Sequence, residues 1–417
     1  MGYNENIIQS DLKSKEYFWV FLYTIISMQF YQYVGIGIDI EKLILCFMIP
    51  IMFVICWKTF TLHVRNELFL LMRWLVVLTA LSIVFAYIFW GQSILYGYRV
   101  TAPEFALLFY FYLYKRRPSL MSLEKYIIIF GILYCLLWLY AFSQIPTRIF
   151  GIADLGDINQ ELKRGMIRVS FIGKGFLILS YFLVLNKAYV LKKKIYSIAS
   201  TIFYIFIMVQ LARQLIFLTG LVTVIYIFQK SKKTLLIAIT AILFLFVTGQ
   251  NIKMNPDTIL GSLIALTEDE WNDNKQGEEN VRIAQYRYFF TEWSPNIMAD
   301  IVGNGLPHWK TVYGNYEGKL RTQKGFFLDD IGYGRMKVVT GYIGLALWFI
   351  LFVRCCFVRM PEHLMYAWMF MMFFLLANVT ASWYATADFQ LAMCISVYLM
   401  TFYGKPKRKN IRYNNTL

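Results

Sequence analysis

Two adjacent carboxylates, Asp329 and Asp330, stand where a polar stretch gives way to an apolar one, in FFLDDIGYGRMKVVTGYIGL. A carboxylate at such a boundary is partly desolvated, and it can then act as a general base that takes a proton from an attacking hydroxyl. The alternative is structural, because a carboxylate there would also cap or solvate the end of a helix. We expect Asp330 to be the catalytic group, with Asp329 as the other candidate.

Arginines beside the apolar stretches form a second group of candidate functional residues. A planar guanidinium matches phosphate oxygens two at a time, so Arg168, Arg213 and Arg282 are candidates to clamp an anionic headgroup. Arg287 follows Arg282 by five residues and points to a different helix face, and Lys174 is a weaker candidate. The alternative is that these side chains reach for lipid headgroups or pair with loop carboxylates.

A third group is aromatic and follows a glycine-rich turn. The turn GNGLP (303–307) permits close backbone approach to a ligand, and His308 comes directly after it. His308, Trp293 and Tyr286 are candidates for contact with a sugar, and His308 is also a third candidate base. A lone loop histidine is more often a surface residue, and an aromatic belt at the membrane interface would explain the other two equally well.

The composition indicates a membrane protein. Of 417 residues, 59% are hydrophobic and 16% charged, which is more apolar surface than a soluble core can absorb. The formal net charge is +16, but the basic residues fall in short runs between apolar stretches, so they suit membrane lipids and topology rather than nucleic acid. The cysteines lie in or beside apolar stretches without histidines at ligand spacing, so we expect no disulfide, no metal and no other cofactor.

A membrane-crossing helix needs about 20 apolar residues, and the chain offers about 12 such segments. The predicted spans are residues 17–38, 42–57, 68–90, 94–114, 126–142, 166–185, 195–211, 213–228, 234–250, 336–353, 364–378 and 388–403. The pair 195–211 and 213–228 could be one long tilted helix. Lysine-rich segments on both sides require an even number of crossings, so we expect two.

The positive-inside rule puts both termini in the cytoplasm. The predicted organisation is residues 1–249 with nine helices, a large and partly helical outer loop at 250–335, and residues 336–417 with three helices and a basic tail. The first span has no small-residue cleavage site, so we expect it to remain uncleaved. Arg99, Arg148, Arg168, Arg213, Arg282, Arg287 and Arg335 then fall near the outer membrane face, against the usual bias.

The order of these features resembles the O-antigen and exopolysaccharide polymerase family (Wzy type). The features are outward Arg168 and Arg213, a long outer loop whose ordered part begins with Arg282, the GNGL turn, DIGY, and a helix with Gly341 and Gly344. The resemblance covers most of the chain in topology and about 180 residues in motif. It implies an all-α polytopic fold of the glycosyltransferase-C type, shared with the O-antigen ligases.

Asp330 separates the two branches of that superfamily. The ligases typically carry a His-Asn pair eleven residues before the first glycine of a G-x-x-G, whereas here Asp330 stands eleven residues before Gly341 and is followed by Ile331. Polymerases tend to carry an aspartate at this position. The departure argues against a ligase and puts a role for His308 in doubt.

The resemblance implies a metal-independent glycosyltransferase in a bacterial cytoplasmic membrane. Its donor and acceptor would be undecaprenyl-pyrophosphate oligosaccharides, joined on the outer face, with a chain-length regulator protein as a further partner. Fixed guanidiniums would hold the leaving pyrophosphate and Asp330 would activate the acceptor hydroxyl. The alternatives are a ligase-like oligosaccharide transferase and a lipid-linked oligosaccharide flippase or other transporter.

Overall fold

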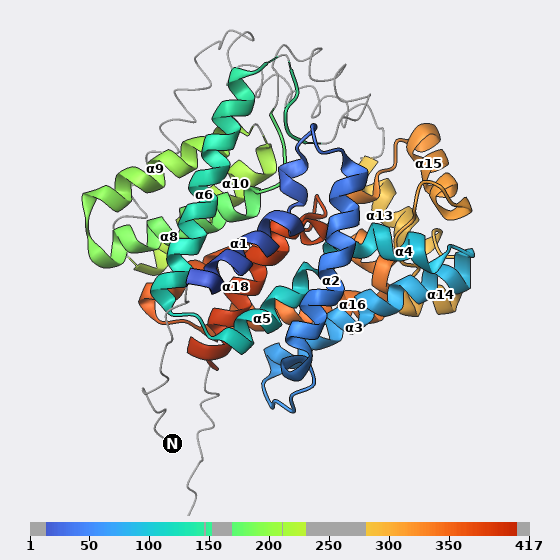
Figure 1. Ribbon diagram of the computed structural model, residues 1–417, viewed down its shortest axis with the longest axis horizontal. Helices are drawn as coiled ribbons and strands as arrows, with labels where there is room; N and C mark the ends of the chain where they lie inside the picture. The colour runs from blue at the N-terminus through green and yellow to red at the C-terminus, as the bar shows by residue number, and fades with distance from the viewer. Residues whose placement is uncertain (1–13, 146, 152–168, 211, 231–280, 407–417) are drawn as a thin grey trace, which may run out of the picture.

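The computed structural model describes residues 14–145, 147–151, 169–210, 212–230 and 281–406. Within these residues the chain is helical almost throughout, and β1 (Val358–Arg359) and β2 (Lys405–Pro406) are the only strands (Figure 1). The longer helices are α1 (Ser14–Ser27), α2 (Ile38–Phe60), α3 (Glu67–Trp90), α6 (Leu120–Ser143), α8 (Lys174–Leu191), α9 (Lys194–Val209), α10 (Arg213–Lys230), α13 (Val281–Thr291), α15 (Val312–Lys324), α16 (Gly332–Phe357), α17 (Met365–Ala377) and α18 (Ala387–Tyr403).

Five of these helices are long and apolar enough to cross a membrane, namely α2, α3, α6, α8 and α16. Shorter apolar helices accompany them at Tyr17–Ser27, Lys194–Val209, Glu362–Ala377 and Ala387–Tyr403. An all-α chain of membrane type is therefore confirmed. The count of about 12 spans and the glycosyltransferase-C-like fold remain predictions.

Several predicted spans coincide with single helices, and the doubtful pair separates as expected. α9 ends at Val209 and α10 begins at Arg213, so the segment forms two helices and not one tilted helix. The predicted span 234–250 lies outside the described residues, as does most of the first half of the outer loop.

The predicted span 94–114 is wrong as one continuous helix. It divides into α4 (Ile94–Thr101), a 3-10 segment η2 (Ala102–Leu107) and α5 (Leu108–Arg116). Pro103 stands at the start of η2, where its missing amide hydrogen removes a helical bond. The break also carries the buried carboxylate of Glu104, which a continuous apolar span would leave without a partner.

The predicted spans 17–38 and 166–185 also need correction at one end. α1 ends at Ser27, and Gln29, Phe30, Tyr31 and Gln32 all have φ between +48° and +58°, so the helix cannot continue. α8 begins at Lys174. There Oδ2 of Asp388, in α18, accepts hydrogen bonds from the amides of Gly173 (2.9 Å) and Gly175 (2.8 Å).

α18 forms the centre of the bundle and is buried at every position from Ala387 to Met400. Figure 1 shows α6, α8, α9 and α10 on one side of it, and α3, α4, α13, α14 (Ile297–Val302) and α15 on the other. A smaller apolar cluster lies under the second group, formed by Tyr288, Phe289, Trp293, Tyr313, Leu320, Leu328, Ile331 and Val338. Residues 281–331, which we call the outer segment because they belong to the predicted outer loop, therefore have their own core, which packs on α16.

A kink in α16 joins this outer segment to the membrane-type helices. Gly341 leaves the helical conformation with φ of 69° and ψ of −174°. In a regular helix the carbonyls of Val338 and Val339 would accept from the amides four residues later. Here they accept instead from the amides of Asn304 (2.7 Å) and Gly305 (3.1 Å).

The glycines at this junction allow main chain to pack against main chain. A Cβ on Gly303 would lie 2.3 Å from the carbonyl oxygen of Val339, and a Cβ on Gly341 would lie 2.2 Å from that of Ile301. Asn304 completes the junction, because its Oδ1 accepts from the Trp90 indole (2.9 Å). Lys337 is fully buried beside it, where it is paired with Asp300 and donates to the carbonyl of Phe289 (3.0 Å).

We expect Gly303→Ala to destabilise the protein, because the added methyl group meets backbone at a residue with φ of +100°. The loss should be about 1–3 kcal/mol, measured as a lower thermal unfolding midpoint in detergent. Gly318→Ala is the control, since it lies inside α15 and its added Cβ meets nothing within 4 Å. Equal midpoints for both variants would contradict the described junction.

Candidate functional site

A polar cavity of ≈ 340 Å³ opens where the outer segment meets α2, α4 and α16. Its charged lining comes from elements far apart in the sequence. The lining residues are Asp39, Lys42, Arg99, Val100, Leu306, Pro307, His308, Trp309, Glu317, Arg321, Leu328, Asp329 and Arg335. Four cations and three carboxylates thus surround one space, which is the densest collection of charge that we find in the described part of the chain.

Arg335 organises one wall of the cavity from the first turns of α16. Its guanidinium is paired with Asp329, and its Nη2 lies 3.5 Å from Oε1 of Glu104 in the break between α4 and α5. The side chains of Arg335 and Glu104 are 15% and 4% exposed, so each charge depends on the other for solvation. Asp329 is fixed further by Ser382, whose amide donates to its carbonyl (2.8 Å) and whose Oγ donates to its Oδ1 (3.3 Å).

Arg321 continues this row of charges from α15. Its Nε lies 2.9 Å from Oε1 of Glu317, one helical turn earlier, and its Nη2 lies 3.8 Å from Oδ2 of Asp329. Burial raises the pKa of Glu317 above its ordinary value, although Arg321 opposes the shift.

The opposite wall comes from the ends of α2 and α4. Arg99 is paired with Asp39, whose side chain is 83% exposed. Lys42 lines the cavity from the first turns of α2. An ion pair this exposed contributes little stability, so Arg99 can exchange its carboxylate for another anion at small cost.

His308 is buried at the cavity wall and is not a surface residue. Gln92 fixes the loop, because its Oε1 accepts from the amide of His308 (2.8 Å) and its Nε2 donates to the carbonyl of Leu306 (2.8 Å). Nδ1 of His308 accepts from the amide of Lys310 (3.2 Å), so a neutral ring carries its proton on Nε2. Burial lowers the pKa of His308, with Arg99 and Lys42 adding to the effect, and this favours that neutral form.

Asp330 lies beside the cavity at the end of a 3-10 turn (Leu328–Asp330), with its side chain exposed. Crowding by neighbouring atoms still raises the pKa of its carboxyl group, and Asp329 adds to the rise. Arg282 and Arg321 act in the opposite direction, as does a hydrogen bond with Gln285. The carboxyl group of Asp330 therefore lies within electrostatic range of Arg282 and Arg321.

None of the other predicted cationic residues is among the described residues that line the cavity. Arg168 lies outside the described residues. Arg213 is the first residue of α10. Arg213, Arg282 and Arg287 are not among the described residues that line the cavity. Lys174 is 5% exposed at the start of α8, where it donates to Oγ of Ser170 (2.6 Å) and lies 5.7 Å from the Trp383 ring.

The predicted aromatic contacts also lie elsewhere. Trp293 is 1% exposed in the core of the outer segment, with its Nε1 3.3 Å from the Tyr313 hydroxyl, so it has no face free for a sugar. Tyr286 donates to the carbonyl of Val379 (2.5 Å) and ties α13 to a neighbouring loop. Trp309 lines the cavity and is 72% exposed, which makes it the available aromatic surface.

Sequence reasoning gave no role to Lys42, Arg321, Glu317 or Glu104. The first three lie on polar helix ends where charge is ordinary. Glu104 did carry a signal, because an acidic residue next to a proline inside an apolar stretch is expected to have a buried partner. No group of three or more His, Cys, Asp or Glu side chains suited to a metal ion occurs among the residues searched, which are those that the structure describes.

We expect Arg335→Gln to destabilise the protein by about 3–5 kcal/mol, because it leaves the Glu104 carboxylate buried without a counter-charge. The double variant Glu104→Gln/Arg335→Gln should recover a large part of the loss, since no buried charge then remains unpaired. Thermal unfolding of the two single variants and the double variant in detergent measures the coupling. Additive losses in the double variant would refute the pairing.

No family model matches the sequence. No curated protein matches it either.

Proposed function

We propose that this chain is a polymerase that joins undecaprenyl-pyrophosphate-linked oligosaccharide repeat units into a surface polysaccharide at the outer face of a bacterial cytoplasmic membrane. The observation that carries the proposal is the cavity itself, in which Arg99, Arg321 and Arg335 converge beside the carboxylates Asp329 and Asp330. The proposed pyrophosphate-binding arginines therefore differ from those expected from the sequence. The proposed base, Asp330, is the same.

Pyrophosphate would bind by exchange of partners. The lining has four cations and three carboxylates, and each of its three arginines is already paired with a carboxylate, so an incoming anion would compete with those pairs. The weakest existing contacts are the exposed pair Arg99–Asp39 and the 3.8 Å contact between Arg321 and Asp329. A diphosphate carries more charge than either carboxylate and matches a guanidinium fork at two oxygens, which favours the exchange.

The reaction would need a base and stabilisation of the leaving group. Asp330 would take the proton from the acceptor hydroxyl while the oxygen of that hydroxyl bonds to the anomeric carbon of the donor sugar. The bond from that carbon to the phosphate oxygen would break, and undecaprenyl pyrophosphate would leave with the electron pair. Fixed guanidiniums would stabilise the charge that develops on the leaving oxygen.

Two observations support Asp330 as the base and Asp329 as a positioning residue. The pKa of Asp330 is raised by the crowding of neighbouring atoms and by Asp329, which makes it a stronger base than an ordinary aspartate. Asp329 is held by Arg335 and Ser382, so its lone pairs are already engaged. Trp309 supplies an exposed ring on which a sugar of the acceptor could stack, next to the Nε2–H of His308.

A second candidate function is a lipid-linked oligosaccharide flippase. The observation that favours it is the interrupted helix α4–η2–α5 with the buried Glu104–Arg335 pair, because transporters often use broken helices with buried charge. An O-antigen ligase-like transferase is the other alternative, and it would use the same cavity.

We expect Asp330→Asn and Arg321→Gln each to reduce chain extension by about 10²–10⁴-fold, because they remove the base and a phosphate-binding cation. The assay restores each variant to a strain that lacks this gene and compares its glycan ladder on a gel. Arg287→Gln is the control, since it removes an exposed charge from α13 outside the cavity.

The alternatives give different patterns in the same assay. Loss of a flippase leaves lipid-linked units on the cytoplasmic side, whereas loss of a polymerase leaves them outside with single units still transferred. A ladder of normal length from both Asp330→Asn and Arg321→Gln would contradict the site. If Arg213→Lys abolishes the ladder and Arg321→Gln keeps it, the phosphate is bound by the arginines predicted from the sequence and not by Arg321.

The pH dependence tests the base separately. If Asp330 accepts the proton, the rate falls as the pH drops through its raised pKa. Arg282 lowers this pKa, so Arg282→Gln should move the acid limb of the pH–rate profile to higher pH. Arg287→Gln should leave the limb in place. Proteoliposomes with purified repeat units provide the measurement, and an unmoved limb in Arg282→Gln would exclude Asp330 as the titrating base.

A further inference from the structure

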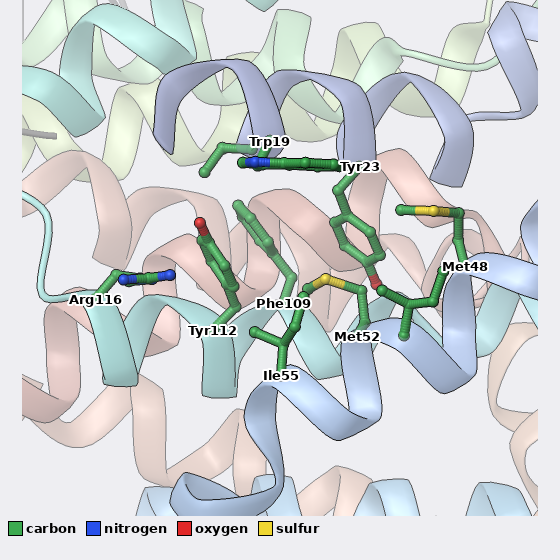
Figure 2. A pocket seen from close by; sticks show the side chains of 10 residues that line it. Trp19, Tyr23, Met48, Met52, Ile55, Phe109, Tyr112 and Arg116 are labelled. Atoms are coloured by element: carbon green, nitrogen blue, oxygen red, sulfur yellow. The ribbon is translucent and has the colours of Figure 1, made fainter. Parts of the chain in front are cut away.

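An apolar groove separate from the polar cavity runs between α1, α2 and α5. Its volume is ≈ 190 Å³, and it is lined by Trp19, Val20, Tyr23, Met48, Ile51, Met52, Ile55, Phe109, Tyr112 and Arg116. Figure 2 shows the α1 side chains Trp19 and Tyr23 along one edge, Phe109 and Tyr112 across from them, and Arg116 at one end. Every lining residue except Arg116 is apolar or aromatic.

The groove has a buried floor and an open rim. Val20, Tyr23, Met52, Phe109 and Tyr112 are each at most 5% exposed. By contrast, Trp19 is 57% exposed and Ile51 is 50% exposed on the rim. The neighbouring outer faces are also apolar, with Phe18, Phe47 and Val54 between 61% and 74% exposed. In a membrane these faces contact acyl chains, so the groove opens sideways into the hydrocarbon region.

The size and lining of the groove suit a hydrocarbon chain better than water. An apolar cavity of about 150 Å³ stays dry and accepts a small apolar molecule, and this groove is larger. Protein interiors leave few voids of this size unfilled. The rings of Phe109 and Tyr112 are stacked nearly parallel (6° between planes, centroids 6.3 Å apart) and form an aromatic wall of the groove. A flexible chain can lie along such a wall with little loss of contact.

The charged end of the groove identifies the kind of headgroup. Arg116 is exposed at the end of α5, where its guanidinium lies 5.9 Å from the Tyr112 ring. Its neighbours in the sequence are engaged elsewhere, because Lys115 donates to the carbonyl of Ile55 (2.6 Å) and Arg117 lies over the rings of Tyr114 and Phe402. Arg116 is therefore the basic residue of the groove lining, and a basic residue beside an apolar surface attracts anionic lipid headgroups.

We propose that this groove binds an anionic glycerophospholipid of the surrounding membrane, with one acyl chain along Phe109 and Tyr112 and its phosphate at Arg116. The site is distinct from the polar cavity, because the two share no lining residue, and their nearest lining residues on α2, Lys42 and Met48, are about 9 Å apart along the helix axis. The inference holds whichever reaction the cavity carries out. It predicts that the bundle depends on anionic lipid for its stability.

The test uses the purified full chain, delipidated in a neutral detergent, and measures lipid binding by native mass spectrometry. Wild-type protein should bind phosphatidylglycerol about fivefold more tightly than phosphatidylcholine, as expected for one basic residue at a headgroup. Arg116→Gln should remove this preference. Arg117→Gln is the matched control, because Arg117 stacks over Tyr114 and Phe402 and does not line the groove. It should keep the preference.

A second variant tests the chain-binding part independently of charge. Ile51→Trp places a larger side chain on the exposed rim, where folding tolerates it, and should weaken binding of both lipids. Equal affinities of wild-type protein for the two lipids, or equal loss of preference in Arg116→Gln and Arg117→Gln, would overturn the proposal. Tighter binding of undecaprenyl phosphate than of phosphatidylglycerol would also overturn it, because the occupant would then be an isoprenoid lipid.

Discussion

The site depends on a junction between two pieces of main chain. α16 kinks at Gly341, and the carbonyls that the kink releases are bonded by the turn at Gly303–Gly305. The same turn leads directly to His308, and the same helix carries Arg335 one to two turns before the kink. His308 and Arg335, which both line the cavity, are therefore held in register by backbone hydrogen bonds, whose geometry is far less variable than that of long side chains.

Around that junction, electrostatics decides which side chains stay in place. Arg335 and Glu104 are too deeply buried to be hydrated, so each requires the other. Arg99, Asp39 and Arg321 are more exposed and can change partners at little cost. The cavity thus combines a rigid ion pair at its base with adjustable ones at its mouth. A site that must hold a highly charged ligand through a reaction and then release it benefits from this division.

Much of the architecture could be predicted from the sequence, because hydropathy and lysine runs are local properties. They located α2, α3, α6 and α16 and the separation of α9 from α10. The break at Pro103 and the assembly of Lys42, Arg321 and Glu317 could not be predicted, since they depend on which helix ends meet in space. Trp293 shows a second limit, because an aromatic residue suited to a membrane interface is equally suited to a small core.

The use of main chain at the junction has an evolutionary consequence. Carbonyl and amide groups are the same in every residue, so the contact survives almost any exchange of neighbouring side chains while Gly303 and Gly341 persist. Chains that share this architecture can therefore diverge until overall identity vanishes. Two glycines 38 positions apart, the second inside an apolar helix, would be the longest-lived trace of common descent.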